Sequence, residues 1–93
     1  MEESSFSEEM IRVLRKHEAE GSQEKIPVII TLKPDLSKLE RSKLESKLET
    51  EGLNISSKLE ILNVLSGFIT PKDARKIAKL VEKIEYDSEM KAF

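Results

Sequence analysis

The chain has 93 residues, no cysteine, sixteen basic and eighteen acidic side chains, and a net charge of -2. A chain of this length supports one small core. The near balance of charges gives no field that would attract nucleic acid or an anionic membrane, so we expect neither partner. Without cysteine the chain has no disulfide, thiol nucleophile or thiolate metal site, and we expect no cofactor and no metal.

The chain shows no targeting signal. No segment reaches the length of a membrane span, and the polar start from Met1 to Ser5 lacks the basic and apolar regions of a signal peptide. We expect a cytoplasmic protein if this is the complete chain, and a secreted one if it is excised from a longer precursor. His17, the one histidine, is interpreted as a partly covered helix residue rather than a catalytic or metal-binding one.

The first segment has the spacing of an amphipathic helix. Its apolar residues, and His17 with them, recur at three- and four-residue intervals: Phe6, Met10, Val13, Leu14 and His17. They predict a helix from about Ser5 to Ala19, with Ser5 and Glu8 as a capping box and Gly21 as its end. We therefore expect residues 1–22 to form a helical extension laid on a domain of residues 23–93.

A strand and a helix follow. The β-branched run from Ile26 to Leu32 predicts the first strand of the domain. Ser37 and Glu40 form a capping box for a helix that runs to Glu51, and Gly52 supplies its C-terminal turn. Its expected apolar side comprises Leu39, Leu44 and Leu48.

Two strands, a helix and a last strand are expected in the rest of the chain. Strands from Asn54 to Leu62 and from Val64 to Ile69 are expected to pair as an antiparallel hairpin. Thr70 and Pro71 open a second helix, and a last strand runs from Ile84 to Asp87. The buried stripe expected for that helix is Ala74, Ile77, Ala78 and Val81. The predicted fold class is α+β, ferredoxin-like βαββαβ, with a four-stranded antiparallel sheet and both helices on one face.

This fold hosts many functions, so function must come from particular residues. Heavy-metal carriers of the fold use a cysteine pair, which is absent here. RNA-binding versions stack bases on aromatic residues, and Phe68 is the only aromatic in the two expected middle strands. An acylphosphatase-type enzyme would need a glycine-rich anion loop with a matching arginine and asparagine, which we do not find. A ligand-sensing module that dimerises through its sheet remains open.

The last thirteen residues carry the most specific pattern. Val81, Ile84 and Tyr86 alternate with the acidic residues Glu85 and Asp87, which predicts a short strand with both carboxylates on one face. A tail of residues 88–93 follows and ends on an aromatic residue: Ser88, Glu89, Met90, Lys91, Ala92 and Phe93.

This pattern resembles subtilisin propeptides, a family that includes stand-alone inhibitors of subtilisin-like serine proteases. The resemblance extends from Ile26 to Phe93 and rests on three landmarks in order. They are the opening strand running into Lys33-Pro34, the pair Gly67-Phe68, and Ile84-Glu85-Tyr86-Asp87 with its tail.

The resemblance implies an inhibitor, not an enzyme, whose partner is a subtilisin-like serine protease. In the family, the sheet face without helices docks on two protease helices, and the acidic pair reaches their N-termini. Glu85 and Asp87 would serve here, although a pair of solvated strand carboxylates is the ordinary alternative. The tail would enter the cleft as an added strand, with Phe93 in the primary pocket, Met90 in a second pocket, and Lys91 and Ala92 between them.

Two forms fit the resemblance. The chain would be either a propeptide that assists folding of its own protease as an intramolecular chaperone and then inhibits it, or an independent inhibitor. Ordinary terminal disorder is the alternative for the tail.

Overall fold

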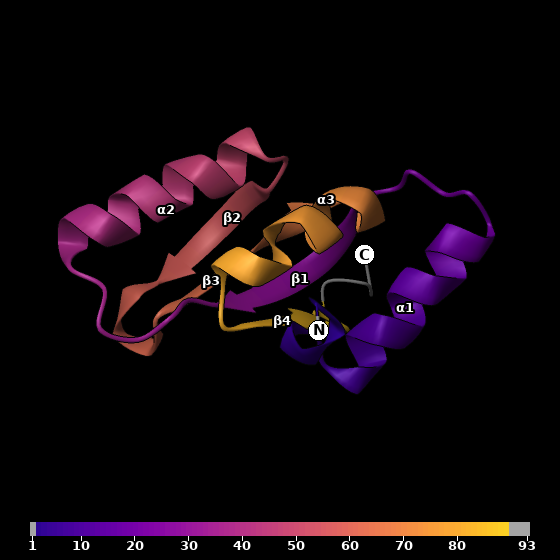
Figure 1. Ribbon diagram of the computed structural model, residues 1–93, viewed down its shortest axis with the longest axis horizontal. Helices are drawn as coiled ribbons and strands as arrows, with labels where there is room; N and C mark the ends of the chain where they lie inside the picture. The colour runs from indigo at the N-terminus through magenta and orange to yellow at the C-terminus, as the bar shows by residue number, and fades with distance from the viewer. Residues whose placement is uncertain (1, 90–93) are drawn as a thin grey trace.

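The computed structural model describes residues 2–89, and Figure 1 shows their arrangement. Helices and strands alternate in the expected order after an N-terminal helical segment. The elements are η1 (Glu2–Ser5), α1 (Glu8–Ala19), β1 (Ile26–Thr31), α2 (Lys38–Thr50), β2 (Asn54–Leu59), η2 (Glu60–Leu62), β3 (Val64–Ile69), α3 (Pro71–Ile77), η3 (Ala78–Leu80) and β4 (Lys83–Tyr86), where η denotes a 3-10 helix.

The four strands form one antiparallel sheet in the order β2-β3-β1-β4. The predicted α+β class and ferredoxin-like order are confirmed. In Figure 1, α2 lies along β2, α3 lies across the middle of the sheet, and α1 lies beyond β4. The side chains of β1 alternate strictly, with Ile26, Val28 and Ile30 buried and the residues between them half-buried. One face of the sheet therefore forms the core.

Local chemistry fixes where α2 and α3 begin. The Ser37 side chain accepts a hydrogen bond from the Glu40 amide at 3.1 Å, and the Ser37 amide donates to the Glu40 carboxylate at 2.9 Å. This reciprocal pair is the predicted capping box. Thr70 caps α3 by accepting from the Asp73 amide, and Pro71 occupies the first helical position, where no amide donor is required.

The start of α1 differs from the prediction. Ser7, not Ser5, caps the helix and accepts from the Met10 amide at 3.1 Å, so the expected capping box of Ser5 and Glu8 is wrong. The reason is a contact distant in sequence. Phe6 forms a parallel bridge with Ile84 of β4, and the Ser7 amide donates to the Ile84 carbonyl at 3.1 Å. The helix therefore starts after this extended pair.

Two details of the α2 and β2 region also differ. Leu39 is 64% exposed, whereas Leu48 is fully buried. The two residues are nine positions apart, or about two and a half helical turns, so they project to opposite sides and Leu39 does not belong to the apolar face. β2 ends at Leu59 rather than Leu62, because residues Glu60–Leu62 turn as a 3-10 helix before Asn63.

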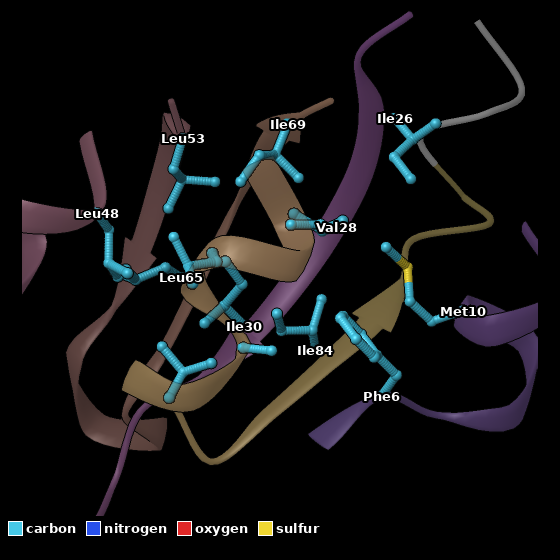
Figure 2. Packing of buried hydrophobic residues seen from close by; sticks show 14 of the residues in the cluster. Phe6, Met10, Ile26, Val28, Ile30, Leu48, Leu53, Leu65, Ile69 and Ile84 are labelled. Atoms are coloured by element: carbon cyan, nitrogen blue, oxygen red, sulfur yellow. The ribbon is translucent and has the colours of Figure 1, made fainter. Parts of the chain in front are cut away.

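The N-terminal segment is part of the core. Phe6, Met10 and Leu14 are buried in the same cluster as the sheet residues, and the Phe6 and Met10 side chains lie beside Ile84 in Figure 2. Residues of the expected extension thus fill the end of the core next to β4 rather than merely lying on it. The other buried members of the cluster are Ile26, Val28, Ile30, Leu32, Leu48, Leu53, Leu65, Ile69, Ala74, Ile77, Ala78, Val81 and Ile84.

Candidate functional site

The second face of the sheet carries no helix in the described part of the chain. Strand alternation directs onto this face the residues that lie between the buried ones. The pairing register sets Ile29 between Ser66 of β3 and Glu85 of β4. We call this surface the open face, and its members from the three paired strands β3, β1 and β4 are Pro27, Ile29, Thr31, Val64, Ser66, Phe68, Lys83 and Glu85.

Gly67 of β3 allows the backbone of β2 to approach closely. A side-chain carbon at this position would overlap the backbone carbonyl oxygen of Asn54 on β2. Glycine is therefore required by the close approach of the two strands, as a glycine inside a strand often indicates. The adjacent residue, Phe68, is half-buried and pairs with Pro27 across the sheet. The Gly67-Phe68 landmark thus has a local structural cause.

The two acidic residues of the C-terminal pattern stand on the β4 side of the open face. Glu85 has 41% of its side chain exposed and lies 3.8 Å from the Lys83 ammonium. Asp87 is half-buried, and its amide donates to the Pro27 carbonyl at 3.0 Å, which continues the sheet pairing past the end of β4. β4 and the residue that follows it therefore present both carboxylates two residues apart, while Ile84 and Tyr86 pack toward the core.

A shallow hollow of about 330 Å³ lies on the open face. Its lining has more apolar than polar surface, and Asp87 and Glu89 are the acidic residues among those that line it. The lining residues are Ile29, Leu59, Val64, Ser66, Tyr86, Asp87, Ser88 and Glu89. The start of the tail thus lies beside this hollow. The predicted tail contacts Met90, Lys91, Ala92 and Phe93 lie outside the described residues.

Sequence reasoning missed the turn between β2 and β3. Ile61 is 99% exposed, Leu62 65% and Leu59 51%, so three large apolar side chains occupy four consecutive positions on the surface. We call residues 59–62 the apolar tip. The signal was available, because the alternation of a half-buried strand breaks down at Ile61-Leu62 directly before Asn63, a residue type that favours the left-handed turn conformation.

The shifted ionisable groups lie away from the open face. The pKa of Glu18 is lowered chiefly by its hydrogen bond to Arg75, and the pKa of Glu40 by its backbone hydrogen bond in the capping box. The Glu45 carboxylate, 2.8 Å from the Lys58 ammonium, raises the pKa of Lys58 and ties α2 to β2. These shifts have structural causes, so they do not indicate a catalytic centre.

Residues 2–89 contain neither a metal-binding cluster nor a membrane-spanning helix. No group of three or more histidine, cysteine, aspartate or glutamate side chains in residues 2–89 could hold a metal ion. Over the same range, no helix has the length and apolar character needed to cross a membrane.

His17 makes a 3.1 Å hydrogen bond through Nδ1 to the Ser22 hydroxyl, which joins the end of α1 to the loop that follows it.

Comparison with known proteins gave no match for this chain, whether against family models, curated proteins or solved structures.

Proposed function

We propose that this protein is a propeptide-like inhibitor of a subtilisin-family serine protease. One observation carries the proposal. Glu85 and Asp87 stand together on the open face, beside the start of a tail that ends in Phe93. The sequence resemblance requires this combination of an uncovered sheet face, two carboxylates on its rim, and a chain end leaving from the same strand.

The acidic pair has a physical role in this proposal. The first amides of a helix have no partner within the helix and carry a partial positive charge. A carboxylate from β4 that reaches such an end gains hydrogen bonds and a favourable field. Two carboxylates two residues apart on one strand can reach two neighbouring helix ends, because they project in the same direction.

The tail supplies the second part of the mechanism. A product-like strand binds a protease cleft through main-chain hydrogen bonds, and its side chains fill separate pockets. Phe93 would occupy the primary specificity pocket and Met90 a second large pocket, with Lys91 and Ala92 contributing backbone pairing. The protein would then block the protease as a cleaved product that has not left, and would perform no chemistry of its own.

The proposal covers two forms of the protein. As a propeptide it would also assist the folding of its protease, since the open face would stabilise the two protease helices before the rest of that enzyme is packed. As an independent inhibitor it would only block the mature enzyme. Both forms share the same contacts.

The test is hydrolysis of a chromogenic peptide by subtilisin, with and without stoichiometric and excess protein. We expect inhibition that depends on concentration and competes with the substrate. Full activity of subtilisin at a large excess of folded protein, together with a stable dimer in sedimentation, would instead favour the sheet-mediated dimerisation module.

A further inference from the structure

We propose that the N-terminal segment, residues 2–19, orders β4 and thereby positions the acidic pair and the tail for binding, with Phe6 as the main positioning residue. The inference rests on the proposed function and deepens it, because it assigns a role to a segment outside the family resemblance. Phe6 is buried, so it acts through Ile84, the β4 residue that it pairs with, rather than by touching the protease.

The first argument is the position of β4 in the sheet. It has four residues, Lys83–Tyr86, and it stands at the end of the strand order with β1 as its neighbour. Short segments near a chain end open locally at a lower free energy than central strands do. Glu85 lies on β4 and Asp87 directly after it, so any local opening of β4 displaces both carboxylates and the start of the tail.

The second argument is that the N-terminal segment contacts the other edge of β4. The Ser7 amide donates to the Ile84 carbonyl at 3.1 Å, and Phe6 forms a parallel bridge with Ile84. β4 therefore has β1 along one edge and the pair Phe6-Ser7 along the other. Local opening of β4 must break this second contact as well as the pairing with β1, which raises its free energy.

The third argument is that the N-terminal segment is itself held by the core. Phe6, Met10 and Leu14 belong to the buried cluster, and Met10 and Leu14 are fully buried. The Ser7 side chain accepts from the Met10 amide as the cap of α1, which links the contact with β4 directly to this helix. The pair Phe6-Ser7 is therefore a fixed partner for β4 rather than a loose chain end.

The contact lies close to the binding residues in the sequence. Ile84 directly precedes Glu85 and is three positions before Asp87. Because Ile84 is fully buried and side chains alternate along a strand, fixing Ile84 also fixes the direction in which Glu85 projects. A surface that is already ordered loses less conformational entropy on association than a loose one does. The N-terminal segment therefore strengthens inhibition without joining the interface.

The first measurement is hydrogen exchange of single amides in Phe6→Ala and in the control Leu48→Ala. The two side chains are buried at opposite ends of the core cluster in Figure 2, so both variants lose stability but only Phe6 lies beside β4. The Asp87 amide donates to β1 at 3.0 Å, and the Leu32 amide donates to the Asn63 carbonyl at 2.9 Å, away from β4. In Phe6→Ala we expect the ratio of the Asp87 exchange rate to the Leu32 rate to rise roughly tenfold or more. In Leu48→Ala this ratio should stay unchanged.

The second measurement is inhibition of subtilisin, at a temperature where thermal melts show each variant to be folded. We expect Phe6→Ala to weaken inhibition roughly tenfold or more, and Leu48→Ala to weaken it less than about threefold. Phe6→Leu keeps a large apolar side chain next to Ile84 and should retain most of the inhibition. If Phe6→Ala does not fold, Phe6→Val takes its place in both measurements, with Leu48→Val as the control.

The outcomes separate the two proposals. Equal weakening of inhibition by the Phe6 and Leu48 variants, or an unchanged exchange ratio in the Phe6 variant, overturns the positioning role and leaves the proposed function standing. A raised exchange ratio with unchanged inhibition means that loosening of β4 has no consequence for binding, and this also overturns the inference. No inhibition by the unchanged protein overturns both proposals.

Discussion

The guanidinium of Arg75 binds the carboxylate of Glu18 through two hydrogen bonds, from Nε at 2.6 Å and from a terminal nitrogen at 3.0 Å. The same guanidinium lies 5.8 Å from the centre of the Phe6 ring. Arg75 therefore joins α3 to both ends of the N-terminal segment, through an ion pair at one end and a cation-π contact at the other.

The ion pair predicts a pH-dependent difference in stability. Arg75 lowers the pKa of Glu18, so the native state favours the ionised carboxylate. The resulting stabilisation is present above the ordinary glutamate pKa of about 4.3 and is lost as pH falls through the lowered native pKa. The Glu18 side chain is 39% exposed, so solvent limits the effect to about 0.5 kcal/mol.

Urea denaturation of Glu18→Gln at pH 7 and at pH 3 measures this difference. We expect the variant to be less stable than the unchanged protein at pH 7, and the difference between the two to be smaller at pH 3. Glu20→Gln, an exposed neighbour on the same helix end, is the control and should show no such trend. An identical deficit at both pH values would show that the ion pair contributes nothing through charge.

The core position of α1 gives a second prediction. Leu14 is fully buried, so Leu14→Ala should lower the free energy of unfolding by roughly 2–4 kcal/mol through lost burial and a residual cavity. Arg12→Ala, at an exposed position of the same helix, should change it by less than about 0.5 kcal/mol. Equal unfolding midpoints for the two variants would mean that the helix is not part of the cooperative unit.

Gly67 and Gly21 offer a contrast between two causes of glycine preference. An added methyl at Gly67 would overlap backbone, whereas at Gly21 it would meet nothing within 4 Å but would require φ of +67°. We expect Gly67→Ala to cost about 2–3 kcal/mol from overpacking and Gly21→Ala about 1 kcal/mol from the left-handed conformation. Chemical denaturation measures the loss of stability in each variant. A larger loss for Gly21→Ala than for Gly67→Ala would mean that β2 can move away from β3 freely.

The acidic pair predicts a change in binding without a change in folding. If Glu85 and Asp87 meet helix ends of the protease, Glu85→Gln with Asp87→Asn should weaken inhibition by roughly 1–3 kcal/mol. The control Glu20→Gln with Glu24→Gln changes net charge equally at exposed positions away from the open face. Equal inhibition constants for the two folded double variants would remove the acidic pair from the interface.

The tail gives the last prediction. Burial of a phenylalanine side chain contributes about 1.5–3 kcal/mol, so Phe93→Gly should weaken inhibition about ten- to a hundredfold. Deletion of residues 90–93 should weaken it further, because main-chain pairing is lost as well. Thermal melts accompany both assays, and a sharply lowered melting temperature with unchanged inhibition would make Phe93 a core residue and contradict the product-like mechanism.

Elements governed by neighbouring residues could be predicted from the sequence. Ser37 with Glu40, and Thr70 with Pro71, fix the two helix starts through contacts within four positions, and both starts are confirmed. The alternation around Glu85 likewise predicted which residues of β4 face the core.

Features that depend on distant partners could not be predicted. The start of α1 is set by Ile84, which lies more than seventy positions from Ser7. The fixed turn at Asn63 depends on Leu32 and Arg41, whose approach follows only from the assembled sheet and helix. The hollow on the open face has the same origin, because it forms between residues of all four strands.

The bridge between Phe6 and Ile84 has a mechanical consequence. β4 has only four residues, and β1 pairs with one side of it while Phe6 and Ser7 hold the other. A strand held along one side alone can be peeled off one hydrogen bond at a time by a force on its end. In the proposed function the protease binds the tail that follows β4, so a force on the tail acts on β4. The N-terminal segment would bear part of this force together with β1, and β4 would be harder to pull out of the sheet.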